Sequence, residues 1–306
     1  MRTMIGTQRT SLVAAVLCIA AIPAAAQQKP AAPAMTWAPV EDVLGRKGAM
    51  QPGDVIKFSF PRSDLSVTVG GVTLKPALAL GGWTAFKETG KGRAMVMGDL
   101  VLTEDEVSSV MRTLQAGGVE QTALHNHVLS ESPRVMYMHI AAHGDATKIA
   151  HAIHDALAQS KTPLGPAAAP AAPSAADLDT TGIAKALGVA GKLNGVVYQV
   201  SVPRGEKIMD MGAEVPPSMG VATAINFQPT GGGKAAITGD FVLRSSEVNP
   251  VIRALRDHGI EVTALHSHML DESPRLFFMH FWANDDAVTL AKGLRVALDQ
   301  TKSKKG

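Results

Sequence analysis

The chain of 306 residues carries 29 basic and 27 acidic residues, which gives a formal net charge of +2, and only 4% of its residues are aromatic. This balance argues against a nucleic-acid-binding protein, because such proteins gather basic residues on one face and stack bases on aromatic rings. A content of 46% hydrophobic residues is enough for two ordinary hydrophobic cores.

Residues 1–26 have the pattern of a secretory signal peptide. Basic residues precede an apolar run, Leu12–Ile22, and the small residues Ala24–Ala26 offer a cleavage site. The only cysteine, Cys18, lies inside the apolar run, so the exported chain would have neither disulfides nor thiolate metal ligands. We therefore expect a periplasmic or secreted protein with no transmembrane segment after signal cleavage.

The rest of the chain is predicted to consist of two similar halves. Residues 27–36 are rich in Ala and Pro and indicate a disordered tether, and residues 161–178 indicate a flexible linker of the same composition. The tether precedes a first repeat at 37–160, and the linker separates it from a second repeat at 179–306.

Each half shows the same order of periodic segments. The first half predicts strands at 55–60, 83–87 and 94–102, a helix at 104–116, a strand that carries a His-x-His pair, a return strand at 135–142 and a helix at 145–160. The second half predicts matching strands at 196–202, 224–228 and 235–243 and a last helix at 285–301. An Asp at the start of each last helix is expected to cap it. This order predicts an α+β fold in which each repeat is a mostly antiparallel sheet with helices on one face, similar to a split βαβ unit, and a pseudo-twofold axis relates the two repeats.

One stretch recurs without a gap. Residues 122–139 read TALHNHVLSESPRVMYMH, and residues 263–280 read TALHSHMLDESPRLFFMH. A fixed offset with matched polar residues is the signature of an internal repeat. The apolar residues between the shared polar ones differ more than the polar ones do, which points to the polar set as the functional part.

The repeated polar residues predict metal binding. Residues two apart on a strand point to the same side, so each His-x-His pair can share an ion, and a third histidine arrives on the return strand. A glutamate in the turn between them could be an oxygen ligand or a base that acts on metal-bound water. The predicted metal ligands are His125, His127, Glu131 and His139 in the first repeat, and His266, His268, Glu272 and His280 in the second. The predicted catalytic residues are Glu131 and Glu272.

Three histidines and a carboxylate suit a divalent transition metal. We expect zinc first, with copper, iron, manganese and nickel as alternatives, and the neighbouring methionines keep copper open. The two sets could form two sites or line one cleft between the repeats. The same histidines could also be ordinary core or surface residues.

Arg134 and Arg275 follow the repeated proline of each turn. A guanidinium there could hold a carboxylate or phosphate of a substrate, or it could pair with the neighbouring glutamate and fix the turn. Asp99 and Asp240, in a repeated Gly-Asp, are interpreted as turn or bulge residues.

The repeated motifs resemble those of the LppY/LpqO family of exported bacterial proteins of unknown function. The likeness rests on Gly98-Asp99, on TALHNH with ESPR and Met138-His139, and on their second-half counterparts, and it covers the mature chain as two family-type units. It implies an envelope or secreted location, and in mycobacterial members a lipid anchor, for which this signal peptide lacks a usable lipobox. It implies no reaction or cofactor.

The sequence therefore predicts an exported metal-binding protein and leaves open whether it is an enzyme. A hydrolase-like reaction by water activation is one form of this hypothesis. The alternative is a metal-free module that binds a small molecule or a cell-envelope ligand, with the histidines and arginines lining a polar groove. The sequence does not give the oligomeric state.

Overall fold

The computed structural model describes residues 1, 3–4, 6, 35–166, 172 and 177–304. The predicted signal peptide and tether lie almost wholly outside the described residues, and so does the middle of the predicted linker. Both repeats belong to a single compact unit, Met35–Gly306. No helix in the described part of the chain is long and apolar enough to cross a membrane.

The first repeat alternates strands and helices as the sequence predicts. Its elements are α1 (Ala38–Leu44), β1 (Ala49–Gln51), β2 (Val55–Pro61), β3 (Thr68–Val69), β4 (Val72–Thr73), β5 (Gly81–Gly90), β6 (Arg93–Thr103), α2 (Val107–Ala116), β7 (Glu120–His125), β8 (Val135–Asp145) and α3 (Ala146–Leu157). The side chain of Asp145 caps α3 by accepting a hydrogen bond from the backbone N–H of Lys148 at 2.9 Å, as predicted.

The second repeat has the same order of elements. They are α4 (Thr180–Leu187), β9 (Lys192–Asn194), β10 (Val197–Pro203), β11 (Met209–Asp210), β12 (Ala213–Glu214), the 3-10 helix η1 (Pro217–Met219), β13 (Ala222–Gly231), β14 (Lys234–Leu243), α5 (Ser245–Asp257), β15 (Glu261–His266), β16 (Phe277–Asp286) and α6 (Ala287–Leu298). The cap of α6 is Asp286, which accepts from the N–H of Thr289, and not Asp285 as predicted, because β16 continues through Asp285.

Each repeat forms a six-stranded antiparallel sheet. The strand orders are β1-β2-β5-β6-β8-β7 and β9-β10-β13-β14-β16-β15, which are equivalent under the repeat. In each sheet the strand that ends at the first histidine lies at the edge, beside the return strand. The predicted α+β fold with two similar halves is confirmed.

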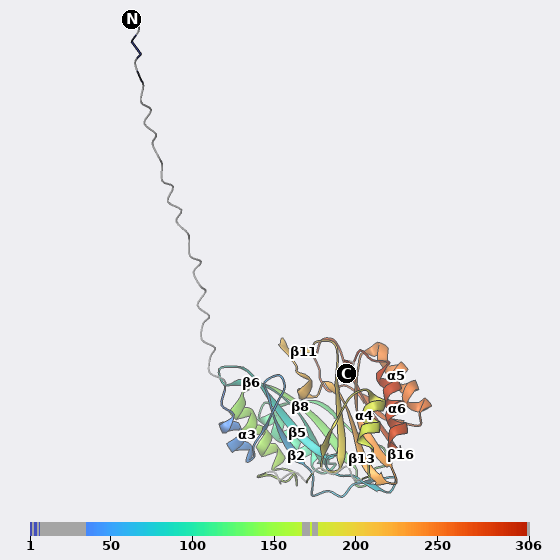
Figure 1. Cartoon of the computed structure of the whole chain (residues 1–306). Coiled ribbons are helices and arrows are strands. Elements are labelled where there is room, and N and C mark those ends of the chain that lie inside the picture. The colour runs from blue at the N-terminus through green and yellow to red at the C-terminus, as the bar shows by residue number, and fades with distance from the viewer. Residues whose placement is uncertain (2, 5, 7–34, 167–171, 173–176, 305–306) are drawn as a thin grey trace. The chain divides into compact units, whose positions relative to one another are not determined.

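The helices cover the outer face of each sheet, and the two inner faces meet (Figure 1). One core packs Phe86 and Met138 against the helices of the first repeat, and another packs Phe227 and Phe281 against those of the second. A third core joins Met97 to Phe278 and other residues of the second repeat. The central strand β6 is buried along almost its whole length, because helices cover one of its faces and the second repeat lies on the other.

A buried arginine at the end of β2 and of β10 fastens each sheet to its first long helix. Arg62 Nη1 lies 2.7 Å from Glu106, and Arg204 Nη1 lies 2.7 Å from Glu247. Each of these guanidinium groups also donates to a backbone carbonyl of the adjoining central strand. These pairs are equivalent under the repeat, so the structural frame is duplicated along with the histidines.

Candidate metal centre

Six histidines meet where the inner faces of the two sheets adjoin. His125 ends β7 and His266 ends β15, and each is followed two residues later by the second member of its His-x-His pair. The third histidine of each repeat lies within the return strand, β8 or β16. We call these six residues the histidine cage; its members are His125, His127, His139, His266, His268 and His280.

Every close stack in the cage pairs a ring of one repeat with a ring of the other. The ring centroids of His125 and His266 are 3.6 Å apart. Those of His139 and His268 are also 3.6 Å apart, and those of His127 and His280 are 3.9 Å apart. All six rings therefore form one cluster between the repeats, and the predicted choice between two sites and one shared site stays a prediction.

Aromatic rings of the return strands pack against the cage at two equivalent places. The Tyr137 ring stacks on His127 with centroids 3.2 Å apart, and the Phe278 ring stacks on His268 at 3.7 Å. In addition, the Thr263 hydroxyl donates to the backbone carbonyl of His127 at 2.5 Å, which ties the second repeat to a cage residue of the first. These contacts hold the imidazoles in place before any ligand arrives.

The ring nitrogens are available as metal ligands. The Nε2 atom of each cage histidine is buried and has no hydrogen-bond partner. In His280 the Nδ1 atom lies 2.7 Å from the Gly239 carbonyl oxygen, and in His125 it lies 3.1 Å from that of Asn126. A carbonyl only accepts, so Nδ1 carries the proton in both rings and Nε2 keeps its lone pair.

Burial keeps the cage uncharged near neutral pH. It lowers the pKa of His125 to about 4 and that of His266 to about 3. In the other four histidines burial lowers the pKa well below its ordinary value, and the neighbouring imidazoles lower it further. Neutral imidazole is the form that binds metal ions, so the Nε2 atoms of these rings need release no proton when an ion binds.

Two carboxyl groups border the cage, of which Asp99 is buried and Asp240 is half-buried. Asp99 faces His139 across β6 and β8, and Asp240 faces His280 across β14 and β16. Burial raises the pKa of Asp99 to about 7, against the lowering effect of Lys57, and it raises the pKa of Asp240 well above its usual range. Interpreting these aspartates as turn residues was wrong, since both lie inside long strands; their recurrence in the repeated Gly-Asp was the signal that they belong to the site.

The histidine donors form two overlapping groups. The ligand atoms of His125, His127 and His139 lie within 4.8 Å of one another. A second group with the same limit contains His125 and the three histidines of the second repeat. Among the described residues, these are the groups whose geometry could hold a metal ion, and together they include every histidine that the sequence predicts as a ligand.

Glu131 and Glu272 belong to neither group. Glu131 Oε1 accepts from the backbone N–H of Val135 at 3.0 Å, and Glu272 Oε1 accepts from that of Leu276 at 2.8 Å. Each glutamate therefore fixes the loop between the histidine strands. Their predicted roles as metal ligand and catalytic base stay predictions. The contacts that the structure shows stabilise the loop.

The two arginines of the turns have different surroundings. Arg275 pairs with Glu272 at 3.2 Å and donates to the Leu270 carbonyl at 3.0 Å, which is the structural alternative. Arg134 is exposed and lies 3.7 Å from Glu104 at the surface. Substrate binding by Arg134 and Arg275 remains a prediction.

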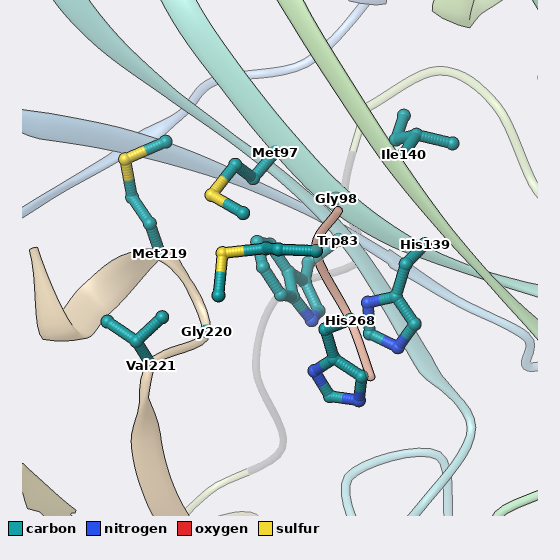
Figure 2. Close-up of a pocket in the computed structure, with 10 residues that line it drawn as sticks. Trp83, Met97, Gly98, His139, Ile140, Met219, Gly220, Val221 and His268 are labelled. Carbon is teal, nitrogen blue, oxygen red and sulfur yellow. The ribbon is translucent and has the colours of Figure 1, made fainter. Parts of the chain in front are cut away.

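A small cavity reaches the cage from one side. Trp83, Met97 and Met219 line it, and His139 and His268 form its wall toward the cage (Figure 2). Thioether sulfur favours copper(I) among the transition metals, so these methionines keep copper among the candidate ions. The cavity also means that two cage rings border open space as well as packed side chains.

Comparison with solved structures gives a weak likeness. The crystal structure of a trimeric bacterial microcompartment shell protein, PduB, is 14% identical in sequence, with a TM-score of 0.23 over 86% of this chain and 97% of that chain. EtuB from Clostridium kluyveri is 10% identical, with a TM-score of 0.19 over 83% of this chain and 91% of that chain. At these scores the likeness carries no argument about function.

Family comparison is more informative. No curated protein matches the chain. A family model described as Domain of Unknown Function (DUF1259) matches residues 38–159 and again residues 181–300, which confirms two tandem family-type units. The LppY/LpqO name stays a resemblance. Because the two matches cover most of the sequence, the chain belongs to the family described as Domain of Unknown Function (DUF1259).

Proposed function

We propose that this protein is an exported metal-binding protein whose ion lies in the histidine cage. The observation that carries the proposal is the set of six buried Nε2 atoms, three from each repeat, that converge without a hydrogen-bond partner. Buried polar atoms in native proteins are nearly always satisfied, so an unpartnered set of this size calls for a bound species. The signal-like pattern of residues 1–26 supports export.

The chemistry of the cage favours a cation over the metal-free alternative. A groove for an anionic ligand needs hydrogen-bond donors, but the free Nε2 atoms of His125 and His280 are acceptors. An ion would satisfy the imidazoles and offset the cost of burying two carboxylates.

Nitrogen and oxygen ligands without thiolate suit zinc first. Copper, iron and manganese also accept imidazole and carboxylate, so they are the alternatives. A hydrolase-like reaction would need a base beside the ion. Glu131 and Glu272 brace their loops by contacts to the backbone, so the proposal is metal binding and assigns no catalytic base.

The test is elemental analysis of the purified chain, before and after reconstitution with zinc, copper, iron or manganese. We expect stoichiometric metal in the wild type and a loss of metal when His127 and His139 are both changed to Ala. The matched control is His151→Ala, an exposed histidine on α3, which should bind as the wild type does. Absence of metal under all conditions would overturn the proposal in favour of the metal-free ligand-binding module.

A further inference from the structure

The cage holds more donors than one metal ion can use. Six imidazoles offer Nε2, and Asp99 and Asp240 each have a buried Oδ1 atom without a hydrogen-bond partner. Zinc in proteins commonly takes four ligands, and other transition metals take up to six. Eight donors are therefore more than one ion can bind, and they are enough for two ions with four ligands each.

The geometry also divides the donors. Ligand atoms bound to one ion at about 2.1 Å can be at most about 4.2 Å apart. The six histidines fall into two groups of ligand atoms within 4.8 Å. One holds the three histidines of the first repeat, and the other holds the three of the second together with His125.

Each carboxylate lies beside the histidines of its own repeat. Asp99 Oδ2 is 3.9 Å from His127 Nε2, and Asp99 Oδ1 is 3.9 Å from His139 Nε2. In the second repeat Asp240 Oδ2 is 3.5 Å from His268 Nε2. Neither aspartate belongs to the histidine groups as they stand, so each side chain would have to turn toward its ion. The separations of 3.5 and 3.9 Å are too long for hydrogen bonds but approach the roughly 3.4 Å expected between two ligands of one tetrahedral ion.

We propose that the cage holds two divalent transition-metal ions, each bound by three histidines and one aspartate of a single repeat. This inference rests on the proposed metal-binding function. The first ion has the ligands His125, His127, His139 and Asp99, and the second has His266, His268, His280 and Asp240. The three-histidine, one-carboxylate set predicted from the sequence is retained, with an aspartate of the neighbouring strand in place of the turn glutamate.

The two ions are neighbours related by the pseudo-twofold axis. His125 belongs to both donor groups, and its ring stacks on His266, so the two subsites adjoin. Two divalent ions with two carboxylates leave a local charge of about +2, since imidazole is neutral. A small anion with oxygen donors is the class of ligand that such a pair attracts.

The experiment counts ions per chain. The full chain is stripped with a chelator, loaded with cobalt(II) or zinc, freed of excess ion and measured by elemental analysis and native mass spectrometry. We expect two ions per chain in the wild type. Asp99→Asn and Asp240→Asn should each lower the affinity for one ion by at least about tenfold and leave the other ion tightly bound. The matched controls, Asp155→Asn on α3 and Asp257→Asn on α5, change exposed aspartates and should retain two.

The outcomes separate the two proposals. One ion per wild-type chain would overturn the two-ion centre and leave metal binding in place, whereas no bound ion would overturn both. Two tightly bound ions in Asp99→Asn would remove that carboxylate from the ligand set and overturn the assignment. Circular dichroism checks that each variant is folded, and the wild-type count decides the number of ions even if a variant fails to fold.

Discussion

His125 of the first repeat and His266 of the second stack on one another with ring centroids 3.6 Å apart. These residues are equivalent in the repeated sequence, so their contact places the pseudo-twofold axis of the repeats between the two rings. The cage therefore belongs to both repeats, and neither repeat alone can build it.

Replacing a ring on this axis should disturb more of the centre than replacing a peripheral one. His125 belongs to both donor groups, whereas His127 belongs to one. We expect His125→Ala to remove a ligand of the first ion and to weaken the second ion through the lost stack on His266, so the affinity for both should fall by at least about tenfold. His127→Ala should lower the affinity for the first ion alone. Competition with a chromophoric chelator measures this. Equal affinity in His125→Ala and the exposed control His151→Ala would contradict the account.

Metal removal should lower the thermal stability of the chain. An ion that binds only the folded chain stabilises it by about 2.7 kcal/mol when its free concentration is 100 times its Kd. For a chain of this size that corresponds to a rise in Tm of about 5–10 °C. Differential scanning calorimetry with and without a chelator measures the change. A Tm that is the same with added metal and with chelator would count against an ion in the cage.

The metal-free chain should lose stability as the pH falls from 7 toward 4. The pKa of His125 is lowered to about 4 and that of His266 to about 3, and the other four cage histidines are lowered as well. Over this range the unfolded chain binds up to six protons on these rings that the folded chain does not.

Two carboxyl groups have the opposite effect on the pH dependence of stability. Because the pKa values of Asp99 and Asp240 are raised, the folded chain keeps up to two protons that the unfolded chain releases. The unfolded state still binds more protons, so stability rises with pH through this window, at about 1.4 kcal/mol per pH unit for each net proton. Urea titrations of the chelated protein at several pH values test the sign, and a constant or inverse dependence would refute it.

The buried arginines should matter for folding and leave metal binding intact. Arg62→Met leaves Glu106 buried without its cation, which is expected to cost about 3–5 kcal/mol of unfolding free energy. Arg204→Met should behave alike because it breaks the equivalent pair with Glu247. The control is Arg134→Met, since Arg134 is exposed. Chemical denaturation measures the loss, and a shift within experimental error for Arg62→Met would show that the pair is dispensable.

Much of the fold follows from local patterns in the sequence. The apolar run 94–102 predicts a buried strand, and the structure places it in β6, which is covered on both faces. The histidines were also recognisable, because three of them recur at a fixed spacing in each repeat. Local periodicity and recurrence are both properties of short stretches, so they can be read without the fold.

Recurrence in the repeated Gly-Asp marks Asp99 and Asp240, but no local pattern places them beside the histidines. Asp99 lies 40 residues before His139 in the chain, and only the register of β6 against β8 brings the two residues opposite one another. The turn glutamate Glu131 is close to the histidines in sequence, yet its contacts are to its own loop. The stacking of His125 on His266 likewise depends on how two sheets meet, which no local pattern contains.

Anomalous diffraction from crystals of the metal-loaded chain is the most direct test of the central claim. The account predicts strong peaks at the absorption edge of the metal inside the cage, each about 2.1 Å from the Nε2 atoms of the histidines of one repeat. Anomalous peaks only at surface sites, with the cage rings free of any ion, would contradict it.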